Sequence, residues 1–189
     1  MRTLPAILMG LVGIFGAFAG YSVQAQGFEL SSTDIAPGST IKQVHAFNSF
    51  GCTGQNTSPA ITWQNPPAGT KSFAVMVHDP DAPTGGAGFW HWVVVDVPAT
   101  AASLSRGAGT SQGSKLPAGA RQITTDFGTP GWGGPCPPVG DKPHRYVFTV
   151  YALKVDRLEL PGNATASFTG FLVNANALGH ASFSALYGR

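Results

Sequence analysis

Residues 133–153 read GGPCPPVGDKPHRYVFTVYAL, a segment rich in Gly and Pro that runs directly into an apolar stretch. From Arg145 to Leu153 most residues are Val, Tyr, Phe or Thr, which favour a β-strand. A proline-fixed loop beside a strand end can hold polar side chains in defined positions. Alternation along the strand places His144 and Tyr146 on one face and Arg145 on the other. His144 and Tyr146 are therefore the paired candidates for a pocket.

A second segment also joins a proline-containing loop to the end of an apolar strand. The sequence HDPDAP at residues 78–83 follows an alternating apolar stretch, and we expect a strand over Ser72–Asp79. Asp79 shares a face with Val75 and Val77, so its carboxylate is expected at the end of an inward-facing row. A carboxylate in that place needs hydrogen-bond partners, which the Asp-Pro-Asp turn can supply.

The third segment is WHWVVVDVP at residues 90–98. It predicts a continuous apolar strand over His91–Val97, ended by Pro98, in a sheet that is buried on both faces. Strict alternation places His91 on the face opposite to both flanking tryptophans.

The rest of the chain predicts a β-rich domain with one substantial helix. We expect opening strands at residues 28–35 and 41–47, a short strand at 61–63 and a closing strand at 181–187, with a long loop over residues 99–119. A helix is expected over Ala166–Leu178, ended by Gly179. Its buried face is predicted from helical spacing to consist of Phe168, Phe171, Leu172, Ala175 and Leu178.

Composition limits the class of protein. The chain has 189 residues, which suits one domain, and 43% of them are hydrophobic, which allows a sizeable core. Only 11% are charged, against about 25% in a typical soluble domain. The formal net charge is +2, and loss of Arg2 with a leader leaves 2 − 1 = +1. This small charge favours neither nucleic acid nor an anionic membrane surface as a partner.

The first 25 residues have the pattern of a secretory signal peptide. Arg2 gives a positive start, Leu4–Tyr21 is apolar, and Val23-Gln24-Ala25 offers small residues for cleavage. A membrane anchor is the alternative interpretation, because the apolar stretch approaches spanning length. Cleavage would leave residues 26–189 as one domain with no membrane span, in the periplasm or outside the cell.

The chain has two cysteines, Cys52 and Cys136. In an oxidising compartment such a pair is more often a disulfide than two thiols, and we expect them to be bonded. The alternative is two buried thiols acting as small apolar residues. Their separation does not resemble a zinc site, and no other metal site is expected.

Together and in this order, the three segments resemble the phosphatidylethanolamine-binding protein family in its bacterial, Raf-kinase-inhibitor-like form, over about Phe28–Arg189. The resemblance implies two packed antiparallel sheets with a helix alongside. It also suggests a cis peptide between Ala82 and Pro83. It assigns an anion pocket to the matching residues, with a glycine- and proline-containing stretch at its mouth: Asp79, His91, His144 and Tyr146, with Gly133, Gly134 and Pro135.

Further residues are candidates for the rim of this pocket, although packing or loop ordering explains each about as well: Asp81, Phe89, Trp90 and Trp132. A carboxylate in an anion pocket needs an explanation, because like charges repel. Asp79 either accepts a hydrogen bond from an imidazole and keeps that ring protonated, or binds the amine of a zwitterionic head group.

These features favour an exported binding protein, without catalysis or cofactor, for a phosphate-type anion or phospholipid head group. The second candidate is an inhibitor or interaction protein that acts on a protease, a kinase or a host signalling partner. The third is a hydrolase that uses Asp79, His91 and His144 as an acid–base set. Against catalysis, the sequence has no nucleophile elbow, phosphate-binding loop, metalloprotease motif or dinucleotide fingerprint.

Overall fold

The computed structural model describes residues 27–189, so the expected leader at 1–25 lies outside the described residues. The described chain is mainly β and contains two antiparallel sheets. The smaller sheet has the order β1 (Glu29–Ser31), β2 (Ile61–Gln64), β5 (Ser103–Leu104). The larger has the order β6 (Arg121–Gln122), β4 (Phe89–Pro98), β3 (Ser72–Asp79), β7 (His144–Leu153), β8 (Ala177–Tyr187).

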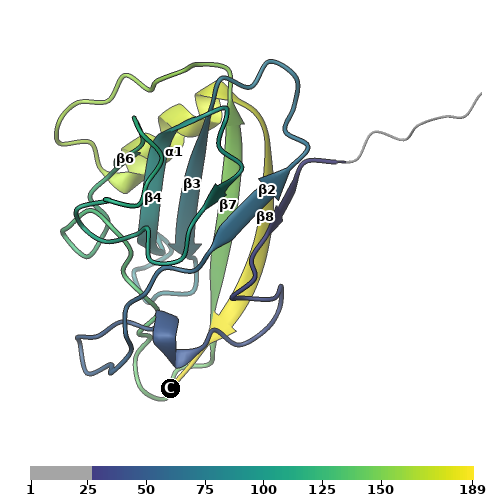
Figure 1. The fold of residues 1–189 in the computed structure, drawn as a ribbon. Helices are drawn as coiled ribbons and strands as arrows, with labels where there is room; N and C mark the ends of the chain where they lie inside the picture. Colours follow the sequence, from purple (N-terminus) through teal and green to yellow (C-terminus); the bar gives the residue numbers. More distant parts are fainter. Residues whose placement is uncertain (1–26) are drawn as a thin grey trace, which may run out of the picture.

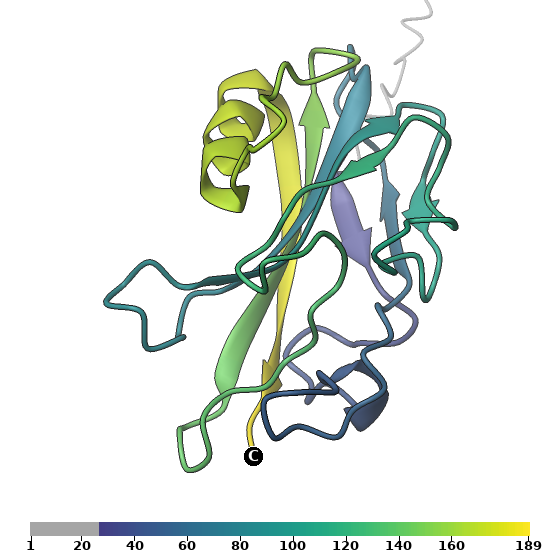
Figure 2. The ribbon, with the colours of Figure 1, turned by 90° about the vertical axis from the view of Figure 1, so that its left-hand side faces the viewer.

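The sheets and one helix form three layers, seen edge-on in Figure 2. The larger sheet is in the middle, the smaller sheet covers one face, and α1 (Ala166–Asn176) covers the other. Alternation along β3 builds both cores: Phe73, Val75 and Val77 face the small sheet, whereas Ala74 and Met76 face the helix. The predicted fold class, two packed antiparallel sheets with one helix near the C-terminus, is confirmed.

The main strands match the sequence expectations closely, but the N-terminal region does not. The strand expected at 41–47 is instead a short 3-10 helix, η1 (Gln43–His45), closed by a bond from Ala46 N to Gln43 O. The strand expected at 28–35 is reduced to β1. The segment Gly38–Ile41 bonds to the outer edge of β8 through isolated backbone contacts rather than a full ladder. Tertiary contacts determine the conformation of these short apolar stretches, and hydrophobic periodicity in the sequence does not predict such contacts.

The helix begins where it was predicted to begin, but its buried face is different. The Thr165 hydroxyl accepts a hydrogen bond from Phe168 N and caps the first turn. The face packed on the sheet consists of Ala166, Thr169, Gly170 and Val173. Of the predicted face, Leu172 is partly buried against the same core, whereas Phe168, Phe171, Ala175 and Leu178 are exposed. The helix lies close to the sheet on this face: a Cβ on Gly170 would be in van der Waals contact with Met76 Cε, at 3.4 Å. The helix also ends earlier than predicted, at Asn176, because the chain passes directly into β8.

A β-bulge changes the orientation of His91. In the β3–β4 ladder, Val77 pairs with Trp92 and His78 pairs with Trp90, so His91 is an extra residue. His91 and Trp92 consequently both lie on the small-sheet side, where His91 contacts Tyr146 and Trp92 contacts Trp132. Trp90 alone faces the helix. The expectation that His91 faces opposite to both tryptophans is therefore wrong for Trp92.

The strand ends that carry the three sequence segments lie at one end of the larger sheet (Figure 1). β3 ends there at Asp79, and β7 begins there at His144. The connecting turn contains no cis peptide, so the expected cis bond at Ala82–Pro83 is wrong. The turn is closed by the Asp79 carboxylate, which accepts from Asp81 N at 2.9 Å, and it forms without the less favourable isomer.

Candidate functional site

A cavity of about 270 Å³ opens at this end of the sheet. Its floor comes from the strand ends, and its walls come from three loops. The lining residues are Phe50, Asp79, Ala82, Pro83, Thr84, Phe89, His91, Phe127, Cys136, Pro137, Pro138, His144 and Tyr146. The structure thus brings together the four polar residues that the sequence proposed for the pocket: Asp79, His91, His144 and Tyr146.

The first pair on the floor is Asp79 and His144, both buried. His144 Nδ1 donates to Asp79 Oδ2 at 2.8 Å, and the other Asp79 oxygen accepts from Asp81 N. His144 Nε2 lies 3.4 Å from an Asp141 carboxylate oxygen. Each imidazole nitrogen therefore faces a carboxylate oxygen, which can only accept a hydrogen bond. Asp79 has partners for both oxygens.

His91 is oriented by the backbone of the Gly133 loop. Its Nδ1 lies 2.6 Å from Gly133 O, and because a carbonyl only accepts, Nδ1 carries the hydrogen. Burial lowers the pKa of His91 to about 4, so the ring is neutral at neutral pH. Nε2 is then a hydrogen-bond acceptor in the wall of the cavity, ready to receive a hydrogen from a ligand.

Tyr146 has an unsatisfied hydroxyl. The residue is 0% exposed, and its hydroxyl has no partner within hydrogen-bonding geometry among the described residues, although the Asp79 carboxylate is close enough to interact with it. Burial, followed by the nearby Asp79 charge, raises the pKa of Tyr146, so the phenol keeps its hydrogen. Its ring meets the His91 ring edge-on, with 5.0 Å between centroids. A buried O–H without a partner is costly, which marks this atom as the one an external acceptor would satisfy.

The walls of the cavity are apolar and were mostly missed from the sequence. Phe127 packs against Phe89 and against His91, with centroid distances of 5.0 and 5.4 Å. Phe50 and Pro137 complete the apolar lining. Phe50 and Phe127 lie in irregular loops, where neither strand nor helix periodicity indicates which way a side chain points. For the apolar walls, the prolines beside Cys136 were the one feature of the sequence that indicated a lining segment.

The Gly133–Pro135 stretch does not line the cavity, where it had been expected at the mouth. It supports the floor instead: Gly133 O holds His91, and a side chain on Gly133 would collide with the Phe127 ring. A Cβ on Gly134 would likewise collide with the backbone at His45. The mouth is formed by the next residues along the chain, Cys136, Pro137 and Pro138.

Of the four rim candidates, only Phe89 lines the cavity. Asp81 turns outward and accepts two hydrogen bonds from the Arg145 guanidinium, at 2.7 and 2.9 Å, which lowers the pKa of Asp81 to about 2.

The two tryptophans proposed for the rim lie away from the cavity. Trp90 lies on the helix side because of the bulge, and its indole donates to Ser167. Trp132 is buried in the core and donates to His45 O.

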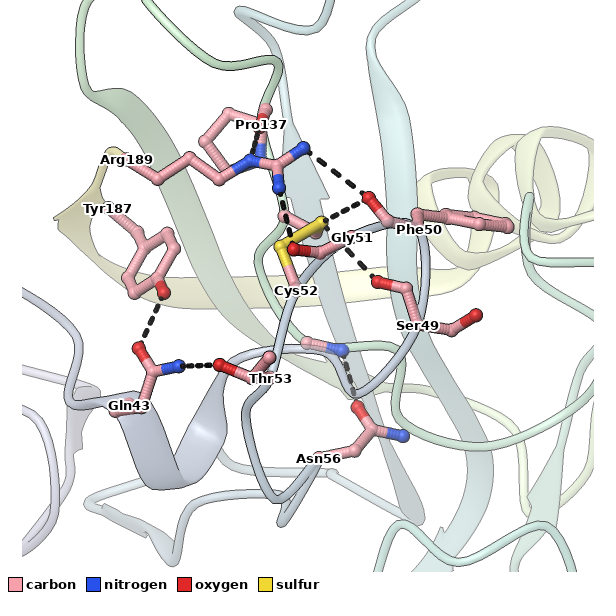
Figure 3. The surroundings of a disulfide bond; sticks show 12 residues. Gln43, Ser49, Phe50, Gly51, Cys52, Thr53, Asn56, Pro137, Tyr187 and Arg189 are labelled. Atoms are coloured by element: carbon pink, nitrogen blue, oxygen red, sulfur yellow. Dashed lines mark hydrogen bonds between the residues drawn. A yellow bond between two sulfur atoms is a disulfide. The ribbon is translucent and has the colours of Figure 1, made fainter.

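The predicted disulfide between Cys52 and Cys136 is present, with 6.0 Å between the Cα atoms. Figure 3 shows its surroundings: the Arg189 guanidinium lies across it and donates to the carbonyl oxygens of Pro137 and Gly51. The Cys136 sulfur lies 3.6 Å from Phe50 O, which is a contact and not a hydrogen bond, because a disulfide sulfur carries no hydrogen. The bond therefore joins the two loops that form the outer wall.

The lining residues set the chemistry that the cavity can perform. Two imidazoles, one phenol and one carboxylate can bind and orient a small polar group, but the lining offers no free thiol and no serine. Within residues 27–189, no group of three or more His, Cys, Asp or Glu side chains is placed to hold a metal ion. In the same part of the chain, no helix is long and apolar enough to span a bilayer.

Comparison with known proteins places this architecture in a family. The family model described as phosphatidylethanolamine-binding protein matches residues 31–188. The UPF0098 protein YbcL of Escherichia coli is 48% identical over 171 residues, which cover 90% of this chain and 93% of YbcL. The UPF0098 protein YbhB of the same organism is 43% identical over 159 residues, 84% of this chain and 99% of YbhB.

Solved structures agree with the sequence matches. The crystal structure of E. coli YbcL, described as a member of the mammalian PEBP family, superposes with a TM-score of 0.83 and covers 86% of this chain and 98% of that one. A homologue from Chlamydia trachomatis, at 25% identity, gives a TM-score of 0.71 and covers 86% and 97%. On its sequence, fold and family-model match, the chain belongs to the phosphatidylethanolamine-binding protein family.

Proposed function

We propose that this protein is an exported, non-enzymatic binding protein whose cavity takes a phosphate-type anion, either free or as the head group of a phospholipid. The contacts are proposed to come from His91 and Tyr146, while Asp79 holds His144 through Nδ1. His144 would contribute through Nε2, where a ligand oxygen would take the place of the Asp141 carboxylate. A ligand oxygen would accept from the Tyr146 hydroxyl. A phosphate that still carries one hydrogen would also donate to His91 Nε2.

The observation that carries this proposal is the unpartnered Tyr146 hydroxyl on the floor of the cavity. Asp79 and His144 have protein partners, and His91 offers only the acceptor Nε2, whereas this donor has no partner among the described residues. An anion oxygen is the strongest acceptor that a small ligand can bring to it. The neighbouring imidazoles supply the rest of a polar cradle within an otherwise apolar wall, as is usual for small-molecule sites.

Export is supported by the leader pattern of the sequence and by the Cys52–Cys136 bond, which persists best in an oxidising compartment. Residues 1–25 would be removed, and residues 26–189 would remain as the mature domain. The absence of a serine or free cysteine from the cavity lining favours binding over hydrolysis.

The test is calorimetric titration with inorganic phosphate and with phosphoethanolamine. We expect dissociation constants in the micromolar to millimolar range and at least tenfold weaker binding by Tyr146→Phe, because a hydrogen bond to a charged group is worth roughly 1.5–3 kcal/mol. Tyr151→Phe is the matched control, since Tyr151 is half-buried and is absent from the cavity lining.

Without ligand, Tyr146→Phe should be at least as stable as wild type, because the change removes a buried hydroxyl that has no partner. This stability measurement separates a ligand contact from a structural role. Equal heats of binding from wild type and Tyr146→Phe would contradict the assignment of the pocket.

A further inference from the structure

We propose that Phe50 selects the organic substituent of the anion, so that the cavity prefers phosphate esters carrying a short apolar group over inorganic phosphate. This inference rests on the proposed function and adds the part of the ligand that lies outside the polar floor. It concerns a residue that neither sequence motif nor strand geometry assigns to the site.

The position of Phe50 is unusual in two respects. Its side chain is 69% exposed, although it is a large apolar group. Its backbone has φ of 55°, in the left-handed region that bulky residues rarely occupy. A strained, exposed phenylalanine at the wall of a cavity points to a ligand contact, because burial in the protein does not account for it.

Phe50 forms one side of an aromatic wall. Its ring is near-parallel to that of Phe127, with an interplanar angle of 11° and 6.2 Å between centroids. Phe47 packs against both rings, with centroid distances of 5.3 and 4.5 Å. Phe89 and the Pro137–Pro138 pair extend the apolar surface around the mouth. An anion held on the floor would therefore present its substituent to aromatic rings and prolines.

Three contacts hold Phe50 in this place (Figure 3). Cys52, two residues along the chain, is bonded to Cys136, whose loop also carries Pro137 and Pro138 of the cavity lining. Arg189 donates to Gly51 O at 3.0 Å and lies 3.4 Å from Phe50 O. Cys52 N also bonds back to Ser49 O, which closes the turn. The disulfide and Arg189 therefore fix the aromatic wall at a set distance from the floor.

The size of the cavity limits the substituent. A volume of about 270 Å³ lies just below the usual range for small-molecule sites. It accommodates a phosphate and the first few carbons attached to it, and excludes a whole acyl chain. The chemical class is thus a short alkyl phosphate, which a soluble monoester or the first carbons of a lipid head group could both provide.

The experiment is a titration of the folded protein with inorganic, methyl, ethyl and butyl phosphate at constant pH and ionic strength. In wild type we expect affinity to rise with each methylene, by up to about fourfold for full burial. Phe50→Ala should flatten this dependence, because the ring that contacts the substituent is removed. Phe171→Ala is the matched control, because Phe171 is 68% exposed but lies on the helix, and it should keep the full dependence.

Removal of the Cys52–Cys136 disulfide, which holds the Phe50 loop, should flatten the chain-length dependence as removal of the Phe50 ring does. The double change Cys52→Ala, Cys136→Ala, studied below its unfolding temperature, should flatten the chain-length dependence while inorganic phosphate still binds. An unchanged dependence in Phe50→Ala would overturn the proposal. So would wild-type binding of methyl phosphate that does not increase with chain length. If neither inorganic nor methyl phosphate binds, the proposed function itself fails.

A final arm distinguishes the source of the ester. Phosphatidylcholine vesicles that contain phosphatidic acid are sedimented with wild type and with Phe50→Ala. Binding of vesicles would assign the ester to a lipid, and binding of butyl phosphate alone would assign it to a soluble monoester. Either source supports the proposal only where Phe50→Ala weakens the binding that is seen, and no effect of the change on either ligand contradicts it.

Discussion

At the scale of single residues, the site depends on which hydrogen-bonding groups are already occupied. Both Asp79 oxygens have protein partners, and His144 lies between Asp79 and Asp141. His91 has one nitrogen fixed by Gly133 O. The Tyr146 hydroxyl is the donor that remains. This pattern favours the first of the two roles considered for Asp79, in which it holds an imidazole rather than binding the amine of a ligand.

Asp79→Asn tests that role. If Asp79 holds His144, the change should weaken inorganic phosphate and phosphoethanolamine to a similar extent, because both ligands depend on the His144 orientation. Calorimetry of the two ligands, with the exposed Asp156→Asn as control, provides the comparison. Stronger binding of phosphate together with selective loss of phosphoethanolamine would show instead that Asp79 binds the amine.

The residues of the floor could be predicted from the sequence because they lie at strand ends, where the alternation of side chains between the two faces of the sheet is clear from the sequence. His144 and Tyr146 do share a buried face, with Arg145 exposed between them. The orientation of His91 relative to Trp92 could not be predicted in this way, since it depends on a bulge in the ladder with β3. The Phe50 and Phe127 walls come from loops, and loop side chains are placed by tertiary contacts alone.

At the scale of elements, the helix shows how periodicity can identify a helix and misplace its buried face. Both faces of α1 carry apolar or small residues, so hydrophobic spacing favoured the face with the larger side chains. Close approach to Met76 selected the face with Gly170 and Val173. The larger side chains, Phe168 and Phe171, were left exposed.

A pair of substitutions in α1 checks this arrangement. Val173→Ala should lower the free energy of unfolding by roughly 2 kcal/mol, because it removes buried methyl groups and leaves a cavity. Phe171→Ala should change it by less than about 0.5 kcal/mol, as expected for an exposed position. Urea denaturation of both variants gives the answer, and a larger loss from Phe171→Ala would mean that the sequence-based face was right after all.

At the scale of the whole molecule, stability is coupled to pH through the buried site. The pKa of His91 is about 4 in the folded protein, against 6.5 for an ordinary histidine, because burial disfavours the charged ring. The unfolded chain therefore takes up a proton on this residue before the folded chain does. Stability is fully present above pH 6.5 and is lost as the pH falls toward 4.

The expected loss from His91 is about 2 kcal/mol between pH 7 and pH 5, a window in which exposed carboxylates barely titrate. His45, whose pKa burial also lowers, adds to it in the same direction. His91→Gln should reduce the pH dependence of the urea midpoint in this window, whereas the exposed His180→Gln should not. An identical dependence in wild type and His91→Gln would show that His91 is not held neutral in the folded protein.

Binding of a phosphate-type anion in the cavity above Tyr146 can be seen in a crystal structure of the protein grown with methyl phosphate. We expect a phosphate in the cavity, with one oxygen in hydrogen-bonding distance of the Tyr146 hydroxyl and another near His91 Nε2. The exposed groove beside Lys142 and Arg145 is the competing location. A phosphate bound there, with the cavity left without one, would contradict the account.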